Sequence, residues 1–372
     1  MIPYDFYYRA AYDNFLKDID VKCYFIKFGP KQDFEFIVEG ESSSKNCIVF
    51  YDQEPFDKAV YINKMLSGRL PQGDGTRIII SSEKSVELDL ASHEFNFKKF
   101  DYFYHGILCV EWYRHLWFKN IQPNANFDRL YITYNNLMLN KRLYRANLLV
   151  ELRKQGLIDK GYASFNTPTI SDIKTSVNAY NYLLPNSHKV NILSNLALLD
   201  QKMVLDSGEV NGSYSAELDP THMQQAFLNL VTETIFYENK VHLTEKSFKP
   251  IVAKMPFILL AGPGSLAYLR KYGFKTFGDF WDESYDQETN PAKRFAKVVE
   301  LLKDLGNLSI GELQKMHKDM LPILEHNFLH FYTELKPIIA AEFTDKLGHI
   351  LSENNIDYNQ TSLVALNRIL SY

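Results

Sequence analysis

The chain has 372 residues, of which 46% are hydrophobic and 23% charged, and its formal net charge is −4 at pH 7. This balance excludes an intrinsically disordered chain, and the negative charge argues against a surface devoted throughout to nucleic acid. The apolar runs are far shorter than the roughly 20 residues of a membrane-spanning helix, and the N-terminus has neither a basic start nor an apolar signal core. We therefore expect a soluble, cytoplasmic protein with no membrane span and with room for two domains.

Short apolar runs alternate with helical patterns in the first third of the chain, which is typical of α/β architecture. The helical patterns cover residues 55–66 and 108–118. The predicted strands are residues 22–28, 34–38, 47–51, 77–81 and 102–105.

A second α/β series follows a polar break at residues 120–126. Residues 167–219 are rich in Asn, Ser and Thr and receive no assignment, whereas residues 291–372 are predominantly helical. The predicted elements between these segments are strands at 130–134, 162–165, 227–236 and 256–260, an amphipathic helix at 142–155 and a second helix that begins after Thr244.

These patterns predict an α/β fold with two Rossmann-like lobes, a cleft between them and a helical C-terminal segment. The expected domains are an acceptor-binding lobe at residues 1–125, a nucleotide-binding lobe at 126–330 and a helical tail at 331–372 that packs back on the first lobe. Ligands of such sheets bind beyond the carboxyl ends of the strands, so functional side chains are expected at strand ends.

The three cysteines, Cys23, Cys47 and Cys109, are widely spaced and lie in apolar or aromatic surroundings. This pattern favours buried thiols over disulfides or a zinc site. No cluster of metal-ligating residues is visible in the sequence, so we expect no metal.

The segment Val241–Ile251, VHLTEKSFKPI, predicts an anion site. Thr244 is a plausible N-cap, which would direct the amides of the next turn and the positive end of the helix dipole at an anion. Lys246 adds a full positive charge, and Glu245 is suited to accept hydrogen bonds from ribose or sugar hydroxyls. The alternative is that Thr-Glu-Lys is simply a favourable helix start.

Two arginines, Arg142 and Arg145, open the helix after the first strand of the second series. A guanidinium presents a planar fork of donors that suits a diphosphate, and cations at a helix N-terminus oppose the dipole and so require another reason to be there. A solvated basic face is the alternative interpretation.

The strand Ile48–Tyr51 ends in Asp52-Gln53-Glu54-Pro55. A carboxylate at a strand end in a partly dry cleft can activate an acceptor hydroxyl, so Asp52 and Glu54 are candidate general bases. His105 is a further candidate. Alternatively, Asp52 caps a helix that has Pro55 in its first turn.

Residues 227–286 contain LVTET, LTEKSFKPI and PFILLAGPGSLAYLRKYGFKTFGDFWDESYD, and they resemble the donor-binding lobe of glycosyltransferases with the two-lobed GT-B fold. The Thr-Glu-Lys helix start is similar to that of the fucosyltransferase-like branch. Residues 139–165 resemble the first strand, helix and second strand of the same lobe. The motifs, with the DQEP segment, also resemble DNA-modifying glycosyltransferases of bacteriophage type.

The resemblance implies transfer of a sugar from a UDP- or GDP-sugar to a hydroxyl, with no cofactor and no metal. It assigns Lys246 and one of the two arginines to the diphosphate and Glu245 to the ribose or sugar. Glu233 matches an acid that flanks the donor site, although it is equally compatible with a buried partner of a lysine. The aromatic-rich N-terminal lobe departs from ordinary fucosyltransferases, so their sugar and acceptor are not carried over.

The acceptor has two alternatives. One is 5-hydroxymethylcytosine in phage DNA, which would place the protein in the host cytoplasm and require phosphate contacts and an extruded base. The other is a glycan or polysaccharide hydroxyl, and a non-catalytic nucleotide- or glycan-binding protein is a third interpretation. No protein partner is implied. The basic residues available for a DNA groove, all near aromatic residues, are Lys98, Lys99, Arg114 and Lys119.

Overall fold

The computed structural model describes residues 6–28, 34–39, 44–66, 75–200, 203 and 218–372. The chain divides into two compact units, one of residues 1–114 together with 332–372 and the other of residues 115–331. The divisions fall inside helix α4 (Tyr104–Trp117) and helix α12 (Ile310–Thr333), near the predicted boundaries at 125/126 and 330/331. The C-terminal segment therefore belongs to the same unit as the N-terminal part of the chain.

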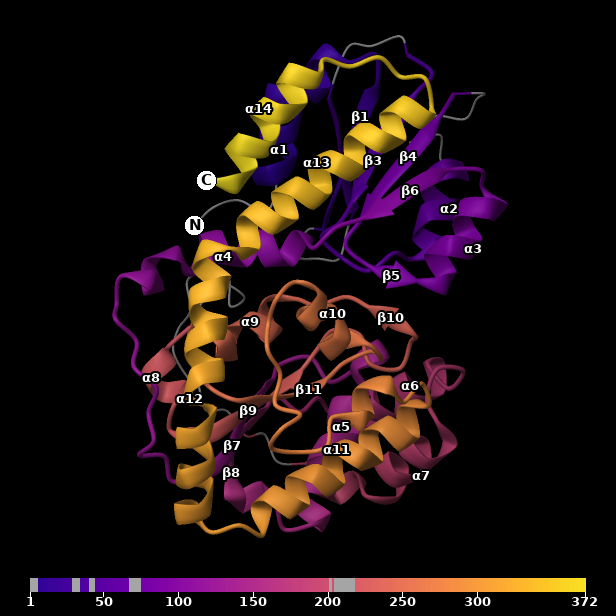
Figure 1. Cartoon of the computed structure of the whole chain (residues 1–372). Coiled ribbons are helices and arrows are strands. Elements are labelled where there is room, and N and C mark those ends of the chain that lie inside the picture. The colour runs from indigo at the N-terminus through magenta and orange to yellow at the C-terminus, as the bar shows by residue number, and fades with distance from the viewer. Residues whose placement is uncertain (1–5, 29–33, 40–43, 67–74, 201–202, 204–217) are drawn as a thin grey trace. The chain divides into compact units, whose positions relative to one another are not determined.

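The first unit contains a five-stranded sheet in the order β2-β1-β3-β4-β6 (Figure 1). All its neighbouring pairs are parallel except β1 and β2, which are antiparallel. Every residue of β3 is buried, as expected for a strand covered on both faces. The strands are β1 (Lys22–Phe28), β2 (Phe34–Glu39), β3 (Cys47–Tyr51), β4 (Arg77–Ser81) and β6 (Lys98–Asp101), and a short β5 (Lys84–Ser85) follows β4.

Helices cover both faces of this sheet. Side chains of α2 (Lys58–Leu66) and α3 (Val86–Glu94) pack against alternate residues of β3, including Val49 and Tyr51. On the other face, Tyr8 of α1 (Phe6–Asn14) lies 4.8 Å from Phe25 between ring centroids. Helix α14 (Gln360–Ser371) lies beside α1, and α13 (Leu335–Glu353) packs against α14 and β6 (Figure 1).

The second unit contains a parallel four-stranded sheet in the order β11-β9-β7-β8. Its strands are β7 (Arg129–Asn135), β8 (Gly161–Phe165), β9 (Ala226–Thr232) and β11 (Phe257–Leu260), with a short β10 (Lys240–Val241) after β9. Its helices, besides α12, are α5 (Tyr144–Lys154), α6 (Ile170–Ala179), α7 (Asn186–Ser194), α8 (Pro220–Met223), α9 (Glu245–Val252), α10 (Ser265–Lys271) and α11 (Pro291–Gly306).

The α/β class, the parallel sheets and the helical C-terminal segment predicted from the sequence are confirmed. The strand predicted at residues 102–105 is wrong, because the strand is β6 at Lys98–Asp101 and α4 begins at Tyr104. This edge strand carries Lys98 and Lys99, which apolar patterning does not detect. The unassigned stretch at 167–219 contains α6 and α7, and its residues 201–202 and 204–217 lie outside the described residues.

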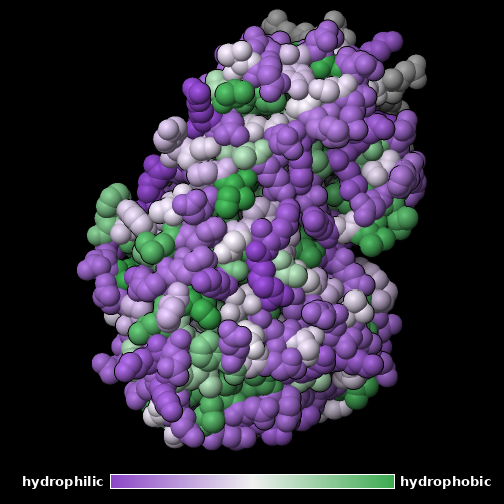
Figure 2. Space-filling model, in the orientation of Figure 1, coloured by the Kyte–Doolittle hydropathy of each residue, from purple (hydrophilic) through white to green (hydrophobic). Residues whose placement is uncertain are grey.

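All three cysteines are buried and none forms a disulfide, as predicted. Burial raises the pKa of the Cys47 thiol to about 12. Within the described part of the chain, no helix is both long and apolar enough to cross a membrane. Figure 2 shows hydrophilic residues over most of the visible face, with hydrophobic residues in small separate groups.

Candidate functional site

The strand order of the second unit creates a topological switch point between β7 and β9. From β7 the chain passes to β8 on one side, and it later returns to β9 on the other side of β7. The connections leaving β7 and β9 therefore diverge, and ligands of open parallel sheets bind in the crevice that this divergence forms outside the carboxyl ends. At these ends Thr232 donates a hydrogen bond of 2.9 Å to Asn135.

Glu233 follows β9 directly and is completely buried. Its Oε1 accepts hydrogen bonds from the Thr244 amide at 3.1 Å and the Ser247 hydroxyl at 2.6 Å. Its Oε2 accepts from the Thr234 amide at 3.1 Å and the Thr244 hydroxyl at 2.7 Å. The carboxylate thus ties the end of β9 to the first turn of α9.

Thr244 occupies the N-cap position of α9, as predicted, and its backbone there is extended. Its side chain, however, makes no capping hydrogen bond. The predicted capping role of the hydroxyl is wrong, because the hydroxyl donates its proton to Glu233 and its oxygen accepts from the Lys246 ammonium rather than from a backbone amide of α9. Glu233, at the end of β9, instead accepts hydrogen bonds from Thr244 and Ser247 at the start of α9. Sequence spacing does not reveal this contact.

Lys246 and Glu245 form an ion pair at the start of α9, with 2.8 Å between Nζ and Oε1. The Lys246 ammonium also donates to the Thr244 hydroxyl at 3.1 Å. Burial by itself lowers the pKa of Lys246, but the carboxylates of Glu245 and Glu233 outweigh it and the net shift is upward. The side chain of Lys246 is 31% exposed and that of Glu245 is 11% exposed, so a cation and a carboxylate both reach the surface of this site.

Arg145 lies at the start of α5 and is only 3% exposed. Its guanidinium donates to the carbonyl oxygens of Leu137 at 2.8 Å, Thr232 at 2.8 Å and Glu233 at 3.2 Å. The neighbouring Tyr144 hydroxyl also donates to the Glu233 carbonyl. Arg145 therefore holds the backbone after β7 and β9 together, and this geometry lends no support to a direct phosphate contact.

Arg142 ends a 3₁₀ helix, Asn140–Arg142, that leads into α5, and it is half-buried. It lies on the segment that connects the carboxyl end of β7 with α5. This segment leaves the sheet at the carboxyl ends of the strands, where the switch point lies. Of the two arginines predicted for a diphosphate, Arg142 is thus the one with surface exposure.

The Gly262-Pro263-Gly264 turn precedes α10, whose first amides are already occupied. The Asp286 carboxylate accepts hydrogen bonds from the amides of Leu266 at 2.8 Å and Ala267 at 3.1 Å. An internal carboxylate therefore satisfies this helix start, and the cation-bearing start of α9 is the one that suits an anion.

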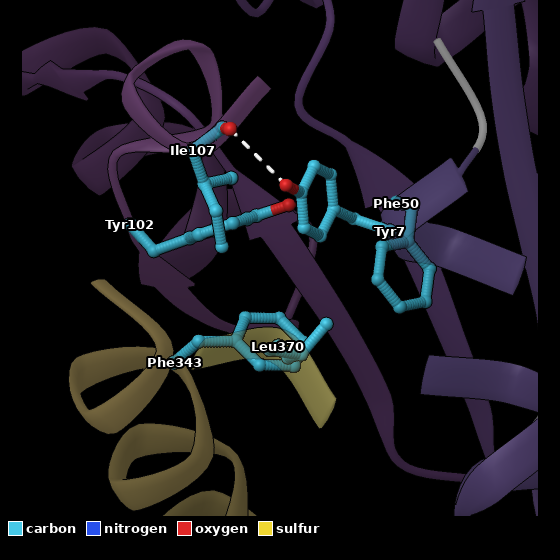
Figure 3. Close-up of a pocket in the computed structure, with 6 residues that line it drawn as sticks. All are labelled: Tyr7, Phe50, Tyr102, Ile107, Phe343 and Leu370. Carbon is cyan, nitrogen blue, oxygen red and sulfur yellow. Dashed lines mark hydrogen bonds between the residues drawn. The ribbon is translucent and has the colours of Figure 1, made fainter. Parts of the chain in front are cut away.

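In the first unit, Asp52 is 1% exposed and accepts a 2.7 Å hydrogen bond from the Tyr102 hydroxyl. Burial raises the pKa of Asp52 to about 7, against the opposing effect of that hydrogen bond. Tyr102 also lines a small cavity of about 10 Å³, room for one water molecule, together with Tyr7, Phe50, Ile107, Phe343 and Leu370 (Figure 3).

The alternative role of Asp52 as a helix cap is wrong. Helix α2 begins at Lys58, and Asp57 accepts the amide hydrogen bonds of its first turn, from Ala59 at 2.9 Å and Val60 at 3.1 Å. Glu54 is half-buried in the connection between β3 and α2, and His105, in the first turn of α4, is 5% exposed.

Two of the four basic residues considered for a DNA groove are engaged in ion pairs. Lys99 pairs with Asp89 at 2.5 Å, and Arg114 pairs with Glu111 at 2.6 Å. The aromatic side chains predicted to accompany them are mostly buried, namely Phe100, Tyr102, Tyr104 and Trp112. Base stacking on these rings therefore has no support in the geometry.

No group of three or more His, Cys, Asp or Glu side chains placed to hold a metal ion occurs in the described parts of the chain. Comparison of the sequence and the structure with protein-family models, with curated proteins and with solved structures finds no match.

The structure brings together four of the residues singled out from the sequence, Glu233, Thr244, Glu245 and Lys246. Sequence reasoning missed Ser247 and Tyr144, which also contact Glu233. Ser247 was detectable, since a residue three positions after a helix cap lies on the same face of the first turn. Tyr144 was not, because its contact joins the start of α5 to the end of β9, 89 positions apart in the sequence.

Proposed function

We propose that this chain is a glycosyltransferase of the two-lobed GT-B type that moves a sugar from a UDP- or GDP-sugar to an acceptor hydroxyl. The observation that carries the proposal is the Lys246–Glu245 pair at the start of α9, beside the switch point of a parallel sheet. Each unit also has its own sheet, one mostly parallel and one entirely parallel, which agrees with this architecture.

The chemistry of the pair suits both halves of the proposed donor. The Lys246 ammonium would neutralise a phosphate and stabilise the charge that develops on the departing diphosphate. The Glu245 carboxylate, an acceptor only, would bind two hydroxyls of a ribose or sugar. Arg142 would add a second cation from the neighbouring strand end. In the first unit, Asp52 or Glu54 would remove the proton from the acceptor hydroxyl.

Nucleotide binding tests the donor site directly. Titration of the full chain with UDP and with GDP is expected to show binding that Lys246→Ala weakens by about tenfold or more, the usual effect of losing a charge-assisted contact. The matched control is Lys303→Ala, which removes an exposed lysine whose partner is Glu300 on the same helix. Equal affinity in all three proteins would contradict the assignment of Lys246.

Turnover tests the reaction. Release of nucleoside diphosphate is measured from a panel of UDP- and GDP-sugars with hydroxymethylcytosine DNA, unmodified DNA, a glycan panel or no acceptor. Release that depends on hydroxymethylated DNA identifies a DNA glycosyltransferase and its donor, whereas stimulation by a glycan identifies the other acceptor class. Nucleotide binding without turnover on any acceptor would contradict the transferase and favour a binding protein.

A further inference from the structure

The Glu233 carboxylate is surrounded by hydrogen-bond donors. It is completely buried, yet it accepts four hydrogen bonds, two at each oxygen. One of the two donors at each oxygen is a backbone amide, of Thr244 at Oε1 and of Thr234 at Oε2. A backbone N–H can only donate, so both positions require an acceptor, and a carboxylate is the side chain that supplies two.

The Thr244 hydroxyl connects this buried acid to the surface of the site. Its single proton is directed at Glu233, so its lone pairs face away from the acid. One of them accepts a hydrogen bond of 3.1 Å from the Lys246 ammonium. Glu233 thereby orients the hydroxyl as an acceptor for Lys246, and networks of this kind strengthen when each member is satisfied.

We call the hydrogen-bonded chain Glu233–Thr244–Lys246 the relay, and further hydrogen bonds hold each of its ends. The Glu233 backbone carbonyl accepts hydrogen bonds from Tyr144 and Arg145 of α5, which anchor the backbone of the acid to this helix. At the surface, Lys246 uses two of its three N–H donors on Thr244 and Glu245. Within the described part of the chain the ammonium donates to these two groups, so its third N–H is the one that would donate to a ligand, with its orientation set by the other two.

We infer that Glu233 is a positioning residue that acts through Thr244 to hold the Lys246 ammonium in the orientation that binds the diphosphate of the donor. The inference rests on the proposed function, since it concerns the same site. It differs from the expectation that Glu233 itself flanks and contacts the donor, because a completely buried carboxylate with both oxygens occupied has no surface to offer a ligand.

Variants of Thr244 and Ser247 test whether Glu233 positions the Lys246 ammonium or only stabilises the fold. Each of these side chains donates one hydrogen bond to Glu233, but only Thr244 also contacts Lys246. Thr244→Val keeps the shape and removes the relay, whereas Thr244→Ser keeps the hydroxyl. Ser247→Ala removes a hydrogen bond of the same carboxylate outside the relay. Affinities for UDP, GDP and inorganic pyrophosphate are measured by calorimetry, alongside the denaturation midpoint of each variant.

Thr244→Val is expected to weaken binding of all three ligands by about tenfold, while Thr244→Ser and Ser247→Ala stay within about twofold of the wild type. In a Lys246→Ala background, Thr244→Val is expected to cause no further loss, because its effect passes through the lysine. Glu233→Gln is expected to reproduce the Thr244→Val loss, since its amide group would face a backbone N–H at either position.

Three results overturn the inference while the proposed function stands. If Lys246→Ala weakens binding but Thr244→Val binds like the wild type, the relay does not position the lysine and the donor site itself stands. If Thr244→Val and Ser247→Ala lose equal affinity, the hydrogen bonds of Glu233 have a structural role only. If the losses of Thr244→Val and Lys246→Ala are additive, the effect of Thr244 does not pass through the lysine. If the wild-type chain binds none of the three ligands, the proposed function fails and the inference fails with it.

Discussion

The Tyr102 hydroxyl donates a 2.7 Å hydrogen bond to the carboxyl group of Asp52, and both side chains are buried. Asp52 follows β3 and Tyr102 follows β6, so the pair joins the carboxyl ends of strands separated by β4. The second carboxyl oxygen, Oδ1, is buried with no hydrogen-bond partner among the described residues. Burial without full satisfaction favours the neutral acid, which explains the raised pKa of about 7.

This raised pKa predicts that Asp52 makes the protein less stable as the pH rises. The unfolded chain loses the proton near the ordinary pKa of 3.8, whereas the folded chain retains it to about pH 7. Between these values the unfolded state binds fewer protons, so the free energy of unfolding falls by roughly 4 kcal/mol at most and then levels off above pH 7. Asp52→Asn is expected to remove this fall, as measured by urea denaturation at pH 5 and pH 8.

Tyr102→Phe is the companion variant for this measurement. It removes the hydrogen bond that favours the carboxylate, so it is expected to steepen the loss of stability toward pH 8. An Asp52→Asn protein with the same pH dependence as the wild type would show that Asp52 titrates normally in the folded state.

The different exposure of Asp52 and Glu54 predicts which of them is the general base. Glu54 is half-buried, whereas Asp52 is 1% exposed and occupied by Tyr102. A general base must reach the proton that it removes, so Glu54→Gln is expected to lower kcat by about 100-fold or more, with a smaller effect of Asp52→Asn. Steady-state kinetics on the acceptor found in the turnover panel checks this, and the reverse ranking in folded proteins would assign the role to Asp52.

Arg145 and Arg142 are expected to respond differently to the same substitution. Lysine lacks the planar fork with which Arg145 binds three backbone carbonyls, so Arg145→Lys is expected to lower the free energy of unfolding by about 2–4 kcal/mol. Arg142→Lys, at a half-buried position, is expected to cost much less stability and to weaken UDP or GDP binding instead. Equal stability of the two variants would contradict the structural role of Arg145.

His317 is expected to make the protein sensitive to acid. It is buried against the rings of Phe127 and Phe227, and this burial lowers its pKa from 6.5 to about 4. Between these values the unfolded chain binds a proton that the folded chain does not, so stability falls as the pH falls, by roughly 3 kcal/mol at most.

His317→Gln cannot titrate, so it is expected to reduce the stability lost between pH 7 and pH 5 in urea denaturation. His115, which is exposed, provides the control, and His115→Gln is expected to leave that loss unchanged. A His317→Gln protein as acid-sensitive as the wild type would show that His317 becomes protonated without unfolding.

Local sequence determined most of the strands and helices of this protein. Runs such as Cys47–Tyr51 and Ala226–Thr232 are mostly apolar because every residue in them is buried, and burial on both faces of a strand favours an apolar side chain at each position. The Thr244–Lys246 helix start was equally visible, because capping residues and first-turn charges lie within one turn of each other.

Tertiary structure alone decided what the polar residues do. Arg142 and Arg145 both lie near the start of α5, and the sequence does not reveal that Arg145 donates hydrogen bonds to backbone carbonyls at the ends of both β7 and β9. The Thr244 hydroxyl that contacts Glu233 lies eleven positions later in the sequence, and the Tyr102 hydroxyl that contacts Asp52 lies fifty positions away. Hydrogen bonds of this kind depend on which strands become neighbours, and strand order is set by packing of the whole sheet rather than by any local pattern.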